Sequence, residues 1–361
     1  GAVLGNAGQQ VLCNADIVCT TCVGAHSHLL SSLAFSAVLI DEATQATEPE
    51  ALIPIVRASN GTGQAKVILV GDQCQLGPVV ICQQAAWGGL SRSLFERLLL
   101  QGYASSRLNV QYRMHPALAE FSAKTFYSDG TGLLDGVTAA ERVCTLSYTV
   151  PGVGLARFPW PTKDPKMFLS VDGVETKSST SFRNELEAEK VCEVVGTLLN
   201  CGVAPTSVGV VTPYDGQRSC VDTMLVESSV GVEVASCVET ASVDAFQGRE
   251  KDFIVFSCVR TSCSIGFLSD PRRLNVALTR ARLGVIVVGN APALLLSNDP
   301  LWTGLILHYS DTKALVQGEW PAGLVVQETV KSGAAGAGAG VSGSTACRSD
   351  TKALVQGEWP A

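Results

Sequence analysis

Carboxylate and amide side chains follow two short apolar runs near the start of the chain. Asp41 and Glu42 come directly after the run AVLI, and Gln75 ends the segment GDQCQ that follows the run VILV. In parallel sheets, ligands bind outside the carboxyl ends of the strands, so these side chains would share one edge. Asp41 could hold Mg²⁺ through its water shell, and Glu42 could orient and deprotonate an attacking water. The alternative for the acidic pair is a solvated helix start.

Gln75 and its neighbour Asp72 complete this predicted edge. We expect Gln75 to contact a γ-phosphate or the attacking water, and Asp72 to couple that contact to the neighbouring loop. Positioning and charge neutralisation are most of what phosphoryl transfer needs from a protein. A plain turn at the end of a strand would also account for GDQCQ.

Two arginines farther along the chain could bring positive charge to the same edge. Arg113 lies in QYRMHP, while Arg280 and Arg282 lie in NVALTRAR, which we interpret as a helix near the next strand. A guanidinium from a second domain would neutralise charge on a transferring phosphoryl group. Tyr112 offers a flat face for an adenine. The alternatives are an interdomain salt bridge for Arg113 and solvated helix positions for the other two arginines.

The segment VDAFQGREKD combines a glycine with two useful carboxylates. Gly248 could bring the backbone close to a ligand, because glycine carries no Cβ. Glu250 could bind a ribose, and Asp244 could link a nucleotide site to a nucleic-acid site.

A further apolar run ends in VTPYDGQ at 211–217. Thr212, Pro213 and Tyr214 could offer backbone contacts to single-stranded nucleic acid, which proteins hold through phosphates and stacking. A plain turn from strand to helix accounts for the same residues equally well.

The phosphate-binding loop G-x-x-x-x-G-K-[ST] does not occur in the 361 residues. Gly61–Lys66 resembles it superficially, but the spacing differs and Val67 stands where Ser or Thr is needed. We interpret that segment as a surface turn. Without the loop's amides and lysine, the β- and γ-phosphates lose their main cradle, so we expect the isolated chain to hydrolyse ATP poorly or not at all.

Composition narrows the class of protein. The chain is 46% apolar and 16% charged, which suffices for a sizeable core, and its length suggests about two domains. No run of about 18 apolar residues would span a membrane, and no secretory signal is present. With a net charge of −7, any nucleic acid must be held in a locally favourable channel. We expect a cytoplasmic monomer that can shuttle to the nucleus.

The 13 cysteines suit reduced thiols rather than a disulfide framework. The motif CTTC at 19–22, with two histidines after it, suggests a zinc site. We interpret Ile17–Val23 instead as a buried strand, which turns the two cysteines to opposite faces, and we expect no zinc. Cysteines in apolar runs should be buried: Cys13, Cys19, Cys192 and Cys258.

Apolar runs alternate with helical patterns along the chain. Glu185–Leu199 places apolar residues, from Leu186 to Leu199, at helical spacing, and Cys201–Gly202 should close that helix. Apolar runs without polar alternation indicate strands covered on both faces of a parallel sheet. These runs are Ala37–Ile40, Val67–Val70, Val208–Val211, Phe253–Val259 and Val285–Val288. The predicted class is α/β with two doubly wound domains.

The predicted domains are residues 1–105 and 106–309, with a linker near Gln101–Ser106 and an inserted loop region at Leu133–Pro165. Residues 310–361 form a low-complexity tail in which SDTKALVQGEWPA occurs twice, at 310–322 and 349–361. We interpret the repeat as a duplication or gene-model artefact, with a functional tandem motif as the alternative.

In their order, these motifs resemble the Upf-like branch of superfamily-1 helicases, the RNA helicases of nonsense-mediated mRNA decay. IDEATQ, GDQCQLGP, QYRMHP, SVDAFQGRE and NVALTRAR carry the resemblance, which covers about residues 11–317. Other relatives in the branch usually carry Pro where this chain has Gly77. GDQCQLGP is therefore specific to the decay helicases.

The resemblance implies two RecA-like doubly wound parallel-sheet domains, the first incomplete here, with ATP and Mg²⁺ held between them. It also implies an ATP-dependent 5′-to-3′ helicase or translocase on single-stranded RNA that acts on DNA as well. By motif match, each predicted residue takes a role: Asp41 and Glu42 as the Walker B pair, Gln75 as γ-phosphate sensor, Arg113 and Arg280 as arginine fingers, Tyr112 on adenine, Glu250 on ribose, and Thr20 and Val23 along RNA.

The chain also departs from the family's pattern. The zinc domain and the phosphate loop are missing, the turn TSCSIGF at 261–267 looks shorter, and the insert around Tyr148–Pro161 looks longer. Other up-frameshift proteins and translation release factors would bind mostly through regions outside these residues. The alternatives are a non-catalytic RNA- or protein-binding scaffold and a DNA helicase of the same branch.

Overall fold

A six-stranded parallel sheet forms the larger part of the fold. The computed structural model describes residues 2–62, 65–130, 132–143, 145–150, 154–228 and 231–320. The strand order is β11-β10-β12-β13-β7-β14, and every neighbouring pair is parallel. The strands are β7 (Lys166–Ser170), β10 (Val208–Thr212), β11 (Glu239–Ser242), β12 (Lys251–Ser257), β13 (Ala281–Gly289) and β14 (Leu315–Gln317).

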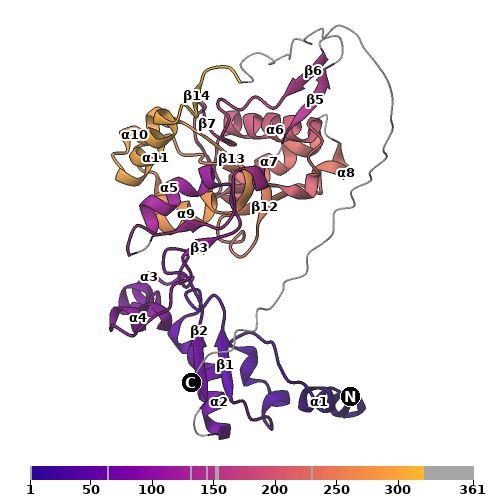
Figure 1. Cartoon of the computed structure of the whole chain (residues 1–361), viewed down its shortest axis with the longest axis vertical. Helices are drawn as coiled ribbons and strands as arrows, with labels where there is room; N and C mark the ends of the chain where they lie inside the picture. The colour runs from indigo at the N-terminus through magenta and orange to yellow at the C-terminus, as the bar shows by residue number, and fades with distance from the viewer. Residues whose placement is uncertain are drawn as a thin grey trace. The chain divides into compact units, whose positions relative to one another are not determined.

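Helices cover both faces of this sheet, as Figure 1 shows. Alternate residues of β12 enter different cores: Ile254 and Phe256 pack on one face, and Phe253 and Val255 on the other. The first face is covered by α5 (Pro116–Phe126), α9 (Pro271–Leu278), α10 (Ala291–Leu296) and α11 (Pro300–Asp311), and the second by α6 (Glu185–Asn200) and α7 (Asp215–Glu227). The predicted doubly wound α/β class is confirmed for this sheet.

The predicted helix at Glu185–Leu199 is confirmed as α6. Asn184 begins it by accepting a hydrogen bond from the Glu187 amide, and Gly202 follows its end with a φ of 86°. Such a positive φ suits glycine at the end of a helix. Leu186 is an exception to the predicted buried stripe, because it is 39% exposed.

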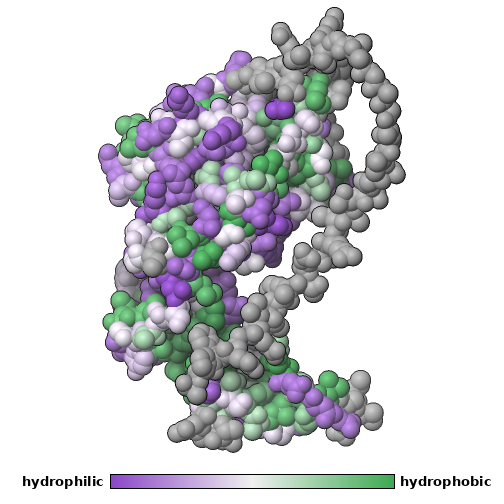
Figure 2. All heavy atoms as spheres, in the orientation of Figure 1, coloured by the Kyte–Doolittle hydropathy of each residue, from purple (hydrophilic) through white to green (hydrophobic). Residues whose placement is uncertain are grey.

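A separate two-stranded parallel sheet carries the first pair of motifs. β1 (Ala37–Ile40) pairs with β2 (Lys66–Leu69), and α2 (Glu48–Thr62) and α4 (Leu94–Leu100) pack against it. Burial on both faces was predicted here and is wrong, because Leu39 is 63% exposed and Ile68 is 47% exposed. Within the part of the chain that the structure describes, no element covers their outer side, and Figure 2 shows apolar surface around these strands.

The segment 17–23 is not the buried strand that we expected. It pairs with no strand in the described parts of the chain, and Ile17 is 78% exposed. Without a neighbouring strand, its apolar residues have no sheet face to enter. Cys19 is therefore exposed, contrary to expectation. Cys13, at the end of α1, is also exposed, whereas Cys258 is buried and Cys192 is partly buried.

Shorter elements connect these parts. The predicted linker follows α4, and 103–109 contains neither helix nor strand. The inserted region contains β4 (Leu134–Asp135) and the hairpin β5–β6 (Ser147–Val150, Gly154–Arg157). The rest are α1 (Ala2–Cys13), η1 (Gly24–His26), η2 (His28–Leu30), α3 (Gln83–Ala85), η3 (Ala86–Leu90), β3 (Val110–Gln111), η4 (Ala140–Arg142), β8 (Thr176–Ser178), β9 (Ser181–Arg183), η5 (Pro205–Ser207), α8 (Val232–Ala235) and η6 (Gly266–Ser269).

The end of the second domain lies beyond the predicted boundary at 309. That position falls within α11, and β14 then joins the edge of the sheet beside β7. Trp320 is buried against Phe158. The first copy of the repeated segment is thus folded as far as Trp320, and the second copy lies outside the described residues.

Candidate functional site

The acidic pair lies at the carboxyl end of β1, as predicted. Asp41 accepts a hydrogen bond from the Glu42 amide at 3.0 Å, and Glu42 has a φ of 51°, which only a minority of non-glycine residues adopt. The amide of Ala43 donates to the carbonyl of Val70 at 2.8 Å. A Cβ at Gly71 would lie 3.2 Å from the Thr44 amide, so glycine lets the two strand ends approach closely.

Asp72 and Gln75 form a hydrogen-bonded pair at the end of β2. Gln75 donates from Nε2 to Asp72 Oδ2 at 2.9 Å, and the Tyr127 hydroxyl donates to the same oxygen at 2.6 Å. Asn275 on α9 donates to that hydroxyl at 2.8 Å and to the Cys74 carbonyl at 3.0 Å. The Gln75 loop is thereby fixed to a helix of the second sheet.

Arg280 reaches Gln75 from the second sheet. Its Nη2 donates to Gln75 Oε1 at 3.0 Å, while Nε donates to the carbonyl of Val276 at 3.1 Å. The residue is 2% exposed, and among the described residues no carboxylate lies within ion-pair distance of it. Burial, and then the charge of Arg113, lower the pKa of Arg280 to about 10. A buried guanidinium with neutral acceptors favours an anionic ligand.

Arg113 lies close to the same point. Its Nε donates to Glu250 Oε2 at 2.5 Å, and Nη1 donates to the Thr279 carbonyl at 3.1 Å. Gln111 accepts from the Arg113 amide at 3.0 Å, which fixes the QYRMHP turn. The partner of Arg113 belongs to the same predicted domain, so the pair is not the interdomain salt bridge that we considered as the alternative.

Residues singled out from the sequence line a larger cavity of about 1260 Å³, which we call the first cavity, and a smaller one of about 490 Å³, which we call the second cavity. The larger cavity collects predicted residues from distant parts of the sequence: Gln75, Tyr112, Arg113, Glu250 and Arg280, together with Asp72 and Arg282. Asp41 and Glu42 are not among its lining residues, although the charge of Glu42 acts on Arg280. Arginines, an aromatic ring and a carboxylate in one cavity match the chemistry of a nucleoside triphosphate.

The Tyr112 ring is 65% exposed and lies against Gly136. A Cβ at Gly136 would clash with the ring, and the Gly136 amide donates to the Gln111 carbonyl at 2.7 Å. Glycine at this position therefore leaves the space that the ring occupies. The exposed ring is available to stack on a flat ligand.

We had expected NVALTRAR to form one helix, but it does not. The helix α9 ends at Leu278, Arg280 lies in the connection, and Arg282 lies on β13. The Thr279 hydroxyl accepts a hydrogen bond from Arg280 Nη2 at 3.0 Å, and its amide continues the last turn to Asn275. Ending the helix here turns Arg280 inward, so the alternative of a solvated helix position is wrong for this arginine.

The residues predicted to contact nucleic acid are in contrasting surroundings. Thr20 and Val23 are exposed, and Pro213 is partly exposed. Thr212 and Tyr214 are buried, and the Tyr214 ring packs between Phe182 and Phe267. The Tyr214 side chain therefore cannot stack on a base here, and any contact from these two residues would come from the backbone.

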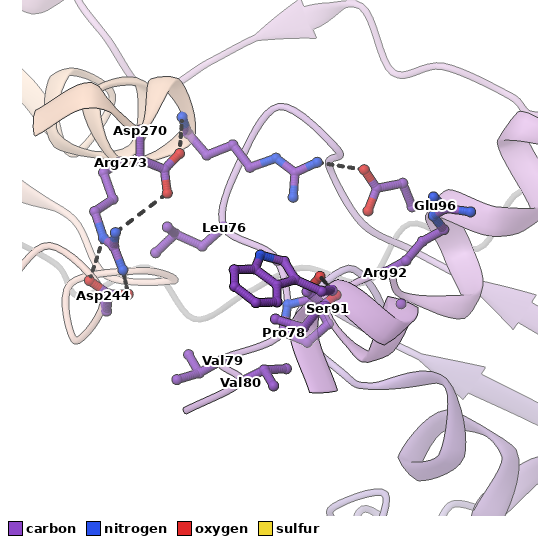
Figure 3. A pocket seen from close by; sticks show the side chains of 15 residues that line it. Leu76, Pro78, Val79, Val80, Ser91, Arg92, Glu96, Asp244, Asp270 and Arg273 are labelled. Atoms are coloured by element: carbon purple, nitrogen blue, oxygen red, sulfur yellow. Dashed lines mark hydrogen bonds and ion pairs between the residues drawn. The ribbon is translucent and has the colours of Figure 1, made fainter. Parts of the chain in front are cut away.

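Asp244 lies at the second cavity rather than the first. Figure 3 shows Arg273 between Asp244 and Asp270, and both Arg273 Nε and Nη2 donate to the Asp244 carboxylate at 3.1 Å. The wall of this cavity begins at Leu76, the residue after Gln75. Gly248 has a φ of 75° and open space beside it, and it is not among the residues lining either cavity.

Several residues that tie the site together were not singled out from the sequence: Tyr127, Gln111, Asn275, Thr279 and Arg142. Arg142 Nε donates to the Arg113 carbonyl at 3.0 Å. Gln111 lies in the recognised motif QYRMHP, and Asn275 and Thr279 lie in NVALTRAR, which was the available signal. Among the described residues, no group of three or more His, Cys, Asp or Glu could hold a metal ion, and no helix is long and apolar enough to cross a membrane.

Comparison with protein families gives two adjoining matches. Residues 4–83 match one AAA domain model, and residues 90–292 match a second AAA domain model. The second match spans more than half of the chain. The division between the two matches falls before α4.

Curated relatives are similar along most of this chain. It is 50% identical over 316 residues to the regulator of nonsense transcripts 1 homolog of Arabidopsis thaliana, covering 86% of the chain and 24% of that protein. It is 49% identical over 318 residues to the ATP-dependent helicase upf1 of Schizosaccharomyces pombe, covering 86% and 32%. The chain thus spans about a quarter to a third of these relatives' lengths.

Among solved structures, the chain is similar to the helicase nonstructural protein 10 of an arterivirus, in a complex with DNA. The TM-score is 0.36 with 15% identity, covering 76% of this chain and 43% of that one. A likeness at this score carries no argument about the function.

Proposed function

The chain belongs to the AAA domain family, in the superfamily-1 branch that includes the regulators of nonsense transcripts 1, and from this we propose that it is part of an ATP-driven RNA motor. The proposed activity is ATP-dependent 5′-to-3′ translocation on single-stranded RNA in nonsense-mediated decay. The contact between Arg280 and Gln75 carries the proposal, because it joins both sheets at one cavity.

In this proposal, ATP occupies the cavity of about 1260 Å³. Tyr112 stacks on the adenine, and the two guanidiniums neutralise charge on the phosphates. Because Arg113 and Glu250 pair with each other at 2.5 Å, nucleotide binding exchanges their ion pair for contacts to phosphate and ribose. Arg280 needs no such exchange, since its acceptors are neutral.

The chemical step needs a base and a positioned water. Glu42 accepts the proton of the attacking water, and Gln75 fixes the orientation of that water or of the γ-phosphate. Asp41 would hold Mg²⁺ through water, and the ion would offset phosphate charge when bound. The exposed carboxylate of Asp41 suits a metal that keeps most of its water ligands.

Coupling to RNA follows from the hydrogen bonds that join the two sheets. Asn275 and Arg280 both contact the 72–75 loop, whose next residue, Leu76, lines the cavity with Asp244. A change at the γ-phosphate therefore reaches the second cavity through a single loop. We propose that the nucleic acid passes this second cavity, and that the backbone at Pro213 and the exposed segment at Thr20 and Val23 also contact it.

The test is a chimera in which this chain replaces the matching segment of the S. pombe helicase. The 361 residues contain no phosphate-binding loop, so the chimera supplies one from the relative. RNA-stimulated hydrolysis in the chimera supports the proposal. A folded chimera that binds RNA and ATP yet hydrolyses no ATP would contradict it. Competition between RNA and DNA oligonucleotides separates an RNA motor from a DNA motor.

A further inference from the structure

The second cavity combines an exposed indole with an exposed guanidinium. It has a volume of about 490 Å³, and Trp87 and Arg92 both line it. Trp87 is 77% exposed, and Arg92 is also exposed. An exposed indole and an exposed guanidinium that line one cavity offer a ligand a stacking face and a positive charge.

The other two arginines that line this cavity are paired with carboxylates. Arg272 donates to Glu96 at 2.5 Å, and Arg273 pairs with Asp244 and Asp270, as Figure 3 shows. Across the described parts of the chain, Arg92 alone among the lining arginines has no ion-pair partner. Three arginines and three carboxylates line the cavity, so its formal charge is balanced, and Arg92 is the lining arginine whose guanidinium is free to pair with an anion.

Part of the cavity wall is apolar. Leu76, Pro78, Val79 and Val80 form it, and Val79 is 78% exposed. A Cβ at Gly77 would lie 2.8 Å from Arg272 Nη1, so the glycine leaves space for the ion pair that borders the cavity. The cavity thus combines apolar lining with an unpaired guanidinium, which suits a ligand that carries a flat apolar group and an anion.

We propose that Trp87 and Arg92 bind one nucleotide of single-stranded nucleic acid, with the base stacked on the indole and the phosphate on the guanidinium. The inference rests on the proposed motor function and assigns a specific grip to it. Phe267 lies next to a lining residue: it is 54% exposed, and the Arg273 guanidinium lies 5.0 Å from its ring centre. Exposed aromatic rings beside arginines are the usual means of holding single strands without reading sequence.

The position of the site gives it a mechanical role. The wall of the cavity starts directly after Gln75, and Gln75 contacts Arg280 in the nucleotide cavity. A strand held by Trp87 would therefore respond to movement of the 72–76 loop. This relationship makes the proposed grip sensitive to the nucleotide state.

The experiment is fluorescence anisotropy of a labelled single-stranded RNA with the full chain. Trp87→Ala should weaken binding at least about five-fold, the lower end for one stacked base, whereas Trp87→Phe should retain most of the affinity. Arg92→Gln should lower the slope of log K against log salt by about 0.7, the value for one single-strand phosphate. Arg157→Gln, an exposed arginine on β6, is the matched control.

Tryptophan emission gives a second measurement that does not depend on affinity. RNA should quench the emission of the wild-type chain, and the quenched part should be missing in Trp87→Phe. Wild-type affinity in Trp87→Ala, with unchanged quenching in Trp87→Phe, would overturn the inference and leave the proposed function standing. Failure of the wild-type chain to bind any RNA or DNA strand would overturn both. An equal response to a DNA strand would support the grip and identify it as indifferent to the sugar.

Discussion

Arg280 Nη2 lies 3.0 Å from Gln75 Oε1, across a sequence separation of 205 residues. The contact joins the end of β2 to the connection between α9 and β13, so it links the two sheets at the proposed phosphate site. Because the guanidinium is buried and its hydrogen-bond acceptors are neutral, it is ready for an anion without first breaking an ion pair.

Replacing Arg280 should therefore lower the rate of ATP hydrolysis strongly and the stability of the fold only moderately. In the chimera, Arg280→Gln should lower the rate of ATP hydrolysis by about 10³-fold, as for other arginine fingers. The cost in stability should be about 1–3 kcal/mol, because the Gln75 oxygen loses its donor. Arg157→Gln is the control, since that arginine is exposed on β6 and is not among the residues lining either cavity. Equal rates for the two variants would refute the assignment.

The role of Glu42 predicts a different kinetic signature. Glu42→Gln should lower the rate of hydrolysis by about 10²-fold or more, because a general base contributes about 10²–10⁴-fold. The affinity of the chimera for ATP should change little, since the carboxylate acts on water rather than on nucleotide. Single-turnover hydrolysis and ATP titration measure the two quantities separately. An unchanged rate would show that Glu42 is not the base.

A substitution at Gly136 tests the stacking role of Tyr112 without replacing the tyrosine. A Cβ at this position would clash with the ring, and the exposed ring can rotate away at little cost. Gly136→Ala should therefore weaken binding of a fluorescent ATP analogue several-fold, by about 1 kcal/mol of lost stacking, with a nearly unchanged melting temperature. Tyr112→Ala should show the same loss. Normal affinity in both variants would contradict stacking on Tyr112.

A buried carboxyl group that does not line the nucleotide cavity should make stability depend on pH. Glu187 accepts hydrogen bonds from the Ser257 hydroxyl and the Val259 amide, both at 2.8 Å, and burial raises its pKa to about 8 from 4.5. A raised pKa in the fold means that this contribution to stability is complete below pH 4.5 and is lost as pH rises toward 8.

The free energy of unfolding should therefore fall between about pH 5 and pH 8.5, by about 1.4 kcal/mol for each pH unit that separates the folded and unfolded pKa values of Glu187. Glu187→Gln removes the titrating group, so its stability should change less over the same range. Denaturant titrations of both proteins at several pH values measure the difference. Parallel curves would mean that the pKa of Glu187 is not raised.

Much of the candidate site could be predicted because short motifs sit at the ends of parallel strands. Asp41 follows β1 and Gln75 follows β2, and the hydrophobic runs alone indicated both strands. That Arg113 and Arg280 would approach the same edge came from the family resemblance, because no local pattern places a residue beside one that is 205 positions away.

Other features depend on packing that a sequence pattern does not record. Tyr214 looked available at the end of a strand, yet Phe182 and Phe267 bury it. Ile17 lies in an apolar run typical of a strand, but no neighbouring strand pairs with that run in the described residues. The low-complexity tail conceals β14, whose three residues are too short to show alternation.

Calorimetric titration of the full chain with Mg·ATP tests the central claim most directly. We expect saturable binding of one nucleotide, weaker than in a protein with a phosphate-binding loop, and at least about ten-fold weaker again in Arg280→Gln, a loss of about 1.4 kcal/mol. The affinity should be unchanged in Arg157→Gln. Binding that is identical in the wild type and Arg280→Gln would contradict the claim that this cavity holds the phosphates.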